Sequence, residues 1–166
     1  RCETCLELVR TLAEVRSRPW FVKHGALIQE LVPPVGYDLR LVVAAGQVVG
    51  AIERVARAGE WRTNVALGGT RRPVRPPREA CALGVTAAAA IGADLVGVDL
   101  LPAAGGYVVL ELNGAVEFDR TYDLGGSNVF ATAAAALDLP RLPLRGRPPV
   151  SSGRTPVPSR PRSRVS

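Results

Sequence analysis

The sequence has little of several residue types on which common catalytic and metal sites depend. It contains one histidine (His24), three cysteines (Cys2, Cys5 and Cys81), no methionine, and lysine only at Lys23. One Cys-x-x-Cys pair and a single histidine do not supply the four ligands of a structural zinc site, so we interpret the cysteines as reduced thiols. The single histidine and the absence of a G-x-S-x-G motif disfavour a hydrolase that uses a Ser/His/Asp or Cys/His apparatus.

Long hydrophobic runs are also missing. No apolar stretch approaches the roughly 18 residues that a membrane-spanning helix needs, and no signal peptide is visible at the start. We therefore expect a cytoplasmic protein without a membrane partner. The length of 166 residues, 47% of them hydrophobic, suits one modest domain. Because the sequence begins with Arg1 and has no methionine, we expect it to be part of a longer polypeptide.

Acidic residues are absent from the last segment, residues 141–166, which carries seven arginines and hence a charge of +7. This segment is rich in Pro, Ser and Gly, and such a composition predicts a disordered basic tail. Residues 1–140 then form the folded domain, with a net charge close to zero. A basic tail could bind nucleic acid through its phosphates, but the tail has no aromatic residues to stack on bases, which disfavours that function.

Hydrophobic periodicity predicts the elements of the first half of the domain. Residues 3–16 have apolar residues at helical spacing, and residues 26–32 (ALIQELV) form a compact apolar run that predicts a strand ended by two prolines. The segments YDLRLVVAA and QVVGAIERVA flank Gly46 and predict a β-hairpin. Residues 59–77 are polar and rich in Gly and Pro, which predicts a long loop of the kind that is often functional.

The second half of the domain begins with an alanine-rich helix that starts at Arg78 and stops at Gly92. The segments DLVGVDLL and YVVLELN then predict two strands, and NVFATAAAALDL predicts a final helix. Because most strands are joined by hairpins, the order favours an α+β domain with a mainly antiparallel sheet and flanking helices over a doubly wound fold.

Three oxygen-bearing side chains stand out in the last two strands. Asp99 and Glu111 each lie six residues from Gly105, so a hairpin centred there pairs them directly, with Cβ atoms about 4.5–5.5 Å apart. Asn113 shares the face of Glu111 because strand side chains alternate. Two such close carboxylates suit a hard cation such as Mg²⁺. The alternative is a half-exposed sheet face on which these side chains are only solvated.

Several motifs then occur in the order seen in one protein family. The segments IQELV, DLRLVVAAGQVVGAIERVARAGEWRTNVALGG, GVDLL and VLELNGA resemble those of the RimK-type α-L-glutamate ligases of the ATP-grasp superfamily. The resemblance runs from about Leu27 to Leu139. It implies the C-terminal half of an ATP-grasp domain, whose family uses ATP to phosphorylate a carboxylate and then lets an amine attack the acyl phosphate.

The resemblance also implies roles for individual residues. The backbone of Gln29, Glu30, Leu31 and Val32 resembles the hinge that holds adenine, with Asp38 near the ribose. The loop residues Arg62, Thr63 and Asn64 resemble those that meet the phosphates and the reacting carboxylate, and Asp99, Glu111 and Asn113 resemble the ligands of Mg²⁺, with Mn²⁺ as an alternative metal. Arg40 lies on the same strand face as Asp38 and could clamp a carboxylate or phosphate bidentately.

Two departures limit what the resemblance implies. The upstream phosphate-binding lysines and glycine-rich lid of the family have no counterpart in this sequence, and Lys23 is too near Glu30 to replace them. We therefore expect this chain alone to be inactive or nearly so. After Asn113, the run NGAVEFD resembles the version found in ligases that act on an amino-group carrier protein, which suggests that Glu117 contacts the amine acceptor. The alternative is that Glu117 is a loop carboxylate without a partner.

The expected partners are an amino-acid carboxylate donor and an amine or protein acceptor, whose identities and whose oligomeric context the sequence does not give. The alternative hypothesis is a non-catalytic module that keeps the ATP-grasp sheet and uses it to bind a nucleotide or a partner.

Overall fold

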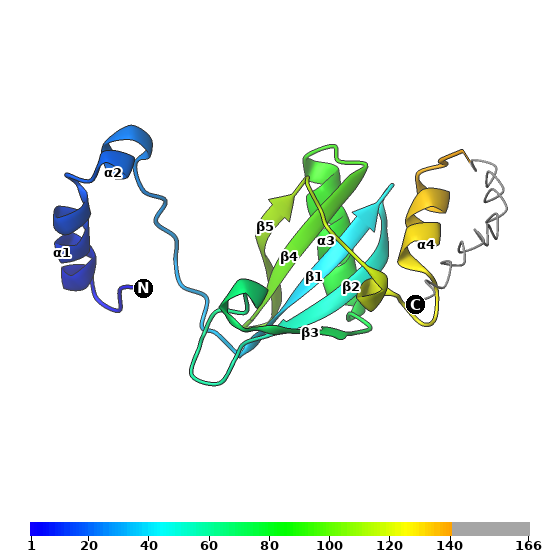
Figure 1. Ribbon diagram of the computed structural model, residues 1–166, viewed down its shortest axis with the longest axis horizontal. Coiled ribbons are helices and arrows are strands. Elements are labelled where there is room, and N and C mark those ends of the chain that lie inside the picture. Colours follow the sequence, from blue (N-terminus) through cyan, green and yellow to red (C-terminus); the bar gives the residue numbers. More distant parts are fainter. Residues whose placement is uncertain (141–166) are drawn as a thin grey trace, which may run out of the picture.

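The computed structural model describes residues 1–140, so the predicted basic tail at 141–166 lies outside the described residues. One antiparallel sheet of five strands, in the order β3-β2-β1-β4-β5, forms the centre of the molecule (Figure 1). The expected α+β class with a mainly antiparallel sheet is confirmed. The strands are β1 (Tyr37–Ala44), β2 (Gln47–Val55), β3 (Thr70–Pro73), β4 (Leu95–Ala103) and β5 (Gly106–Asn113).

The two faces of the sheet carry separate hydrophobic cores. Because strand side chains alternate, Leu41 and Val43 of β1 face the helix α3 (Arg78–Ala90), together with Val98 and Leu100 of β4. On the other face, Val42 and Ala44 of β1 and Val49 and Ile52 of β2 pack against two further elements, η2 (Arg120–Tyr122) and α4 (Val129–Ala136). The sheet is therefore covered on both faces, with α3 on one and α4 on the other (Figure 1).

The two predicted hairpins are present, and tight turns set their registers. Ala45 and Gly46, both at positive φ, join β1 to β2, as a two-residue hairpin turn with the twist of the strands requires. Ala103 pairs with Gly106 at the start of the second hairpin. The β4–β5 ladder then shifts by one residue after Leu100, and this bulge pairs Asp99 with Glu111. The predicted opposition of the two carboxylate residues is thus confirmed.

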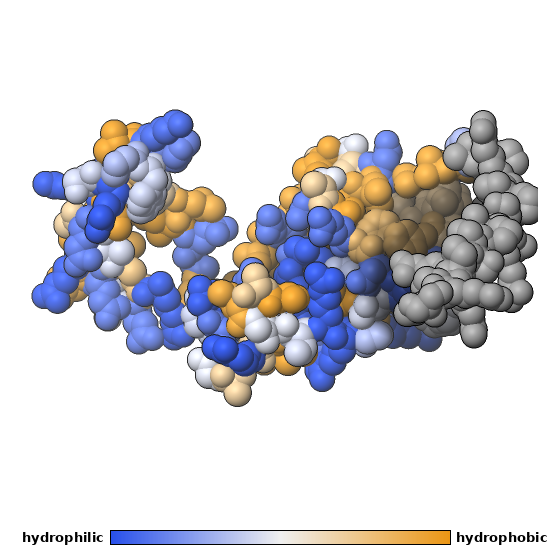
Figure 2. All heavy atoms as spheres, viewed as in Figure 1, coloured by the Kyte–Doolittle hydropathy of each residue, from blue (hydrophilic) through white to orange (hydrophobic). Residues whose placement is uncertain are grey.

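The helices predicted at either end of the domain are also confirmed. The first helix, α1 (Cys5–Val15), begins with the Thr4 hydroxyl accepting a hydrogen bond from the Glu7 backbone N–H. A short helix, α2 (Pro19–His24), follows, and the two form an arm beside the sheet (Figure 1). None of the residues in α1 or α2 is buried, and apolar residues lie at the surface of the arm (Figure 2).

No helix among the described residues 1–140 is long and apolar enough to cross a membrane. The cytoplasmic location expected from the sequence stays a prediction.

The predicted strand at 26–32 is wrong. These residues are extended but belong to no strand, because no neighbouring backbone within residues 1–140 pairs with them. An apolar run of this length satisfies the composition of a strand, whereas a strand also needs a hydrogen-bonded partner. Gln29, Glu30 and Val32 instead line a small recess together with Leu101 and residues 108–110.

The predicted loop at 59–77 is only partly a loop. It contains a short 3-10 helix, η1 (Val65–Leu67), and the edge strand β3, which pairs with β2. The arginines and prolines around Thr70 hid this strand, since proline is rare in strands. Pro73 is tolerated because β3 lies at the edge of the sheet.

Candidate functional site

Four charged side chains gather on the sheet face that also carries α4. Asp38 and Arg40 come from β1, Arg54 from the neighbouring β2, and Asp99 from β4 on the other side of β1. Arg54 is paired with Asp38 and Asp99 with Arg40 in the two ladders, so the registers place opposite charges directly across from each other.

The carboxylates hold both guanidinium groups through their Nε and Nη2 atoms. Arg40 donates from Nε to Asp99 Oδ1 at 2.6 Å and from Nη2 to Asp99 Oδ2 at 2.7 Å. Arg54 donates from Nε and Nη2 to the two oxygens of Asp38, both at 2.7 Å, and Nη2 also reaches Asp99 Oδ2 at 2.9 Å. The side chains of Asp38 and Asp99 are 2% and 3% exposed, so these are buried, bidentate ion pairs. We call these four residues the ionic network.

The network keeps both arginines charged. The hydrogen bond with Asp99 raises the pKa of Arg40 more than burial lowers it. Burial lowers the pKa of Arg54, but the hydrogen bonds and charges of Asp38 and Asp99 outweigh it, and the net pKa is raised.

The Nη1 group of each guanidinium is available to a ligand. Among the described residues, neither the Arg40 Nη1 nor the Arg54 Nη1 has a hydrogen-bond acceptor. Every buried side-chain nitrogen in residues 1–140 does have a partner, so these two atoms are not buried. The Nη1 groups of Arg40 and Arg54 therefore reach solvent, and such a pair of cationic donors suits a carboxylate or a phosphate.

The predicted metal ligands lie on the same side of the sheet as the network. Glu111 is exposed and faces Asp99 across the β4–β5 ladder, and Asn113 is half-buried two residues further along. The Asn113 Oδ1 accepts a hydrogen bond from the Ala115 backbone N–H at 3.1 Å. Within residues 1–140, no three His, Cys, Asp or Glu side chains cluster as a metal site would. The donors that do adjoin, two carboxylates and one amide oxygen, are the hard oxygen ligands that Mg²⁺ accepts alongside water.

The loop before β3 is fixed on the network by a threonine. The Thr63 hydroxyl donates a hydrogen bond to Asp38 Oδ2, which ties residues 61–64 to the sheet. The return of the chain into β3 needs a glycine, because a Cβ on Gly69 would overlap the Thr63 carbonyl oxygen and lie 3.0 Å from the Asn64 carbonyl oxygen. The Gly69 N–H also donates to that Asn64 oxygen at 3.2 Å, so the loop is closed by backbone contacts.

Within this loop, Glu60 holds Arg62. Glu60 Oε1 accepts from the Arg62 Nε and N–H groups, both at 3.0 Å, and Oε2 accepts from Nη2 at 2.8 Å. The hydrogen bonds from Arg62 lower the pKa of Glu60 to about 2. The pair is therefore fully formed above the ordinary glutamate pKa and is lost only as the pH falls through about 2.

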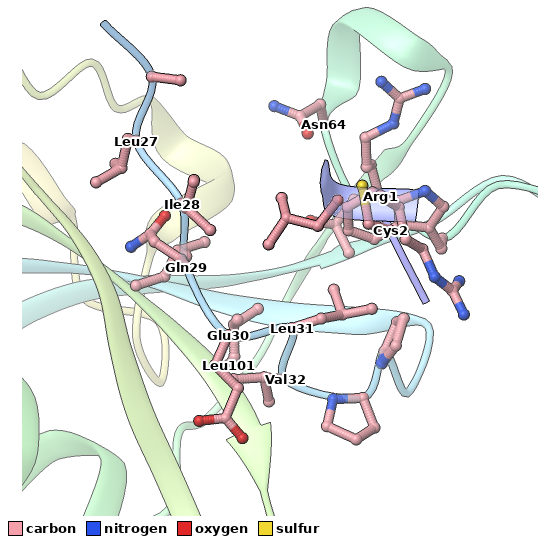
Figure 3. Close-up of a pocket in the computed structure, with 18 of the residues that line it drawn as sticks. Arg1, Cys2, Leu27, Ile28, Gln29, Glu30, Leu31, Val32, Asn64 and Leu101 are labelled. Atoms are coloured by element: carbon pink, nitrogen blue, oxygen red, sulfur yellow. The ribbon is translucent and has the colours of Figure 1, made fainter. Parts of the chain in front are cut away.

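A cavity of about 670 Å³ brings two of the predicted segments together (Figure 3). Residues 29–32 line one wall, and residues 61–64 line another. The rest of the wall is largely apolar and comes from the first two residues, α1, α2, residues 26–28 and 33–37, the end of β4, and β5. The ionic network does not line this cavity, and Thr63 connects the two, since it lines the cavity and bonds to Asp38.

Two residues of the site, Arg54 and Glu60, were missed from the sequence. Arg54 and the predicted Asp38 each lie eight residues from Gly46, so a hairpin centred there places these opposite charges across from each other. Charge complementarity at that register was the signal that could have found Arg54. Glu60 gave no such signal, because its contacts depend on the local loop conformation.

Comparisons with known proteins agree with this fold. The family model described as "RimK-like ATP-grasp domain" matches residues 5–136. The chain is 41% identical over 106 residues to a probable α-L-glutamate ligase of Serratia proteamaculans (strain 568), a match that covers 60% of this chain and 35% of the relative. A protein of the same name from Thioalkalivibrio sulfidiphilus (strain HL-EbGR7) is 37% identical over 109 residues, or 65% of this chain and 36% of the relative.

A solved structure shows the same fold at lower identity. The ATP-grasp ligase PsnB, complexed with a minimal precursor, Mg and ADP, superposes with a TM-score of 0.50 at 23% identity, over 76% of this chain and 40% of PsnB. The chain spans about a third of the length of the curated relatives it matches.

Proposed function

Because the chain belongs to the RimK-like ATP-grasp family, we propose that its site serves an ATP- and Mg²⁺-dependent ligase that joins a carboxylate to an amine. The observation that carries the proposal is the shared cavity. Residues 29–32, expected to hold adenine, and residues 62–64, expected to meet the phosphates, are at least 30 positions apart in the sequence yet line one space of about 670 Å³. That volume lies within the range of small-molecule sites.

The adenine would lie against the extended segment 29–32. This segment has no strand partner among residues 1–140, so its backbone N–H and C=O groups are available to the ring edge of a purine. The apolar wall of the cavity would cover the ring faces. Asp38 carries a further expectation, a contact with the ribose, although in the structure its carboxylate is engaged by Arg54 and Thr63.

The reaction would proceed in two transfers. A carboxylate oxygen of the donor amino acid attacks the γ-phosphorus of ATP, and ADP leaves. The amine nitrogen of the acceptor then attacks the acyl carbon, phosphate leaves, and the nitrogen gives up a proton. Mg²⁺, when bound by Asp99, Glu111 and Asn113, would neutralise the phosphate charge. The protein's own part is to position the reactants and stabilise charge.

The arginines would do most of this charge stabilisation. The Nη1 groups of Arg40 and Arg54, which have no acceptor among residues 1–140, suit the donor carboxylate and the acyl phosphate formed from it. Arg62, with Asn64 beside it, lines the cavity where the phosphates would lie. Glu117 is exposed on the segment that follows Asn113, where it would contact the amine of a free amino acid or of a protein.

One observation favours a second function, a binding module that performs no chemistry. Both oxygens of Asp99 accept hydrogen bonds from Arg40 and Arg54. A metal ion bound to Asp99 would have to share this carboxylate with two guanidinium cations, which disfavours metal binding. A module of this kind would bind a nucleotide or a partner and would not activate a carboxylate.

Trapping with hydroxylamine separates the two functions. In the presence of glutamate and MgATP, hydroxylamine attacks the carboxylate that a ligase site has activated and forms a hydroxamate. The hydroxamate gives a coloured complex with iron(III), which is measured by absorbance. We expect slow hydroxamate formation that requires both ATP and Mg²⁺, at a rate far below that of ordinary enzymes, because this chain spans only about a third of the length of the relatives it matches. ATP binding without any hydroxamate would favour the binding module. Turnover at ordinary enzyme rates would contradict the expected near-inactivity of the chain.

A further inference from the structure

We propose that Glu60 is a positioning residue that aims the free edge of the Arg62 guanidinium into the cavity, toward an oxyanion of the phosphate type. The inference deepens the proposed function and rests on it for the identity of the ligand. Neither the sequence patterns nor the family resemblance gave Glu60 a role. Its contacts in the loop are the reason to assign one.

A count of donors shows what Glu60 leaves free. A guanidinium has five N–H donors, and Glu60 accepts from Nε and from one N–H of Nη2. Three donors remain, two on Nη1 and one on Nη2, and one from each of these nitrogens lies along the Nη1–Nη2 edge of the plane. That edge has the spacing to bind a phosphate or carboxylate bidentately. An incoming anion therefore has no need to displace Glu60.

The Glu60 carboxylate is itself held in place. Besides the side chain of Arg62, it accepts hydrogen bonds from the backbone N–H groups of Trp61 at 2.9 Å and of Arg62 at 3.0 Å. The Glu60 side chain is 15% exposed, whereas that of Arg62 is 47% exposed. The guanidinium also lies 5.8 Å from the centre of the Trp61 ring. An otherwise flexible arginine at the cavity wall is thus fixed at three points.

The same arrangement recurs in the ionic network. Asp99 holds the Nε and Nη2 edge of Arg40, and Asp38 holds the same edge of Arg54. In all three cases a carboxylate takes the Nε side of the fork and leaves Nη1 free. Ordering an arginine before the ligand arrives removes part of the entropy cost of binding.

The test measures binding of MgATP and of inorganic tripolyphosphate by calorimetry. In Glu60→Gln, an amide N–H₂ faces the Arg62 donors, so part of the clamp is lost while the size of the side chain is kept. Glu53→Gln is the matched control, because Glu53 also accepts from an arginine, the Arg72 Nη2 at 2.6 Å across the β2–β3 ladder, outside the cavity. We expect Glu60→Gln to weaken binding about two- to tenfold, the factor for ordering one long side chain, and Glu53→Gln to leave it unchanged.

Combining Glu60→Gln with Arg62→Gln shows whether Glu60 acts through Arg62. Once Arg62 is absent, a positioning residue has nothing to position, so adding Glu60→Gln to Arg62→Gln should change the affinity no further. A purely structural role would instead lower the thermal midpoint and weaken binding equally in both backgrounds. As a check on the clamp without ligand, the carboxyl pKa of Glu60, followed by NMR, should rise from about 2 toward its ordinary value in Arg62→Gln.

Each outcome decides something. Unchanged or tighter binding in Glu60→Gln, with MgATP bound by the wild type, overturns this inference and leaves the proposed function intact. A wild type that binds tripolyphosphate but not MgATP contradicts the proposed nucleotide site, and the tripolyphosphate affinities of the variants then decide the role of Glu60. A wild type that binds neither probe overturns both.

Discussion

Replacing Asp99 with Asn should lower the free energy of unfolding by about 3–5 kcal/mol, the usual cost of removing one partner from a buried ion pair. Asp99 is the shared acceptor of Arg40 and Arg54, and its side chain is 3% exposed. The substitution leaves two guanidinium groups around a neutral amide whose N–H₂ points at other donors. Stability should therefore fall whether or not the protein binds a metal.

Urea unfolding followed by circular dichroism measures this effect. The midpoint should shift to lower urea at an unchanged slope, which shows that stability and not the unfolding mechanism has changed. Glu111→Gln is the control, since Glu111 is the exposed residue opposite Asp99 in the ladder and should scarcely move the midpoint. A loss below about 1 kcal/mol in Asp99→Asn, typical of exposed pairs, would mean that the network is not a buried structural unit.

Replacing Gly69 with Ala should disrupt the loop that carries Arg62, Thr63 and Asn64. The added Cβ would overlap the Thr63 carbonyl oxygen, and a backbone atom cannot rotate away as a side chain can. The loop must move, which breaks the Thr63–Asp38 hydrogen bond. We expect a loss of about 1–3 kcal/mol, as for other overpacking substitutions, together with a loss of MgATP affinity of about tenfold or more.

Gly114→Ala is the matched control for this substitution. Gly114 has open space where a Cβ would be added, and its φ is not positive. Its thermal midpoint should stay at the wild-type value while that of Gly69→Ala falls. If Gly69→Ala bound MgATP as tightly as the wild type, the closed loop would not be part of the nucleotide site.

The hairpins and helices could be predicted because their signals are local. Gly46 and the alternating residues around it determine the first hairpin, and the alanine-rich run that ends before Gly92 determines α3. The opposition of Asp99 and Glu111 was predicted from symmetry about Gly105. In the structure a bulge produces that register, because a two-residue turn alone would shift the pairing by one residue.

The wrong predictions, at residues 26–32 and 59–77, concern segments whose structure depends on whether another strand pairs with them. Residues 26–32 have the composition of a strand and lack a paired neighbour, whereas β3 has a poor composition and gains one in β2. Arg40 and Asp99 are 59 residues apart in the sequence, so only the pairing of β1 with β4 in the sheet reveals their contact. From the sequence, Arg40 was expected to bind a carboxylate or phosphate of a ligand. In the structure it binds a carboxylate of the protein itself, that of Asp99.

Calorimetric titration of MgATP into the wild type, Glu111→Ala and Glu79→Ala tests the central claim most directly. Glu111 makes no ion pair or side-chain hydrogen bond within residues 1–140, so its loss should remove a metal ligand without unfolding the protein. Glu79 lies exposed on α3, away from the site, and serves as the charge-matched control. The account predicts weak, Mg²⁺-dependent binding that Glu111→Ala abolishes and Glu79→Ala retains. Equal binding by all three folded proteins, with or without Mg²⁺, would contradict a metal-assisted nucleotide site at Asp99, Glu111 and Asn113.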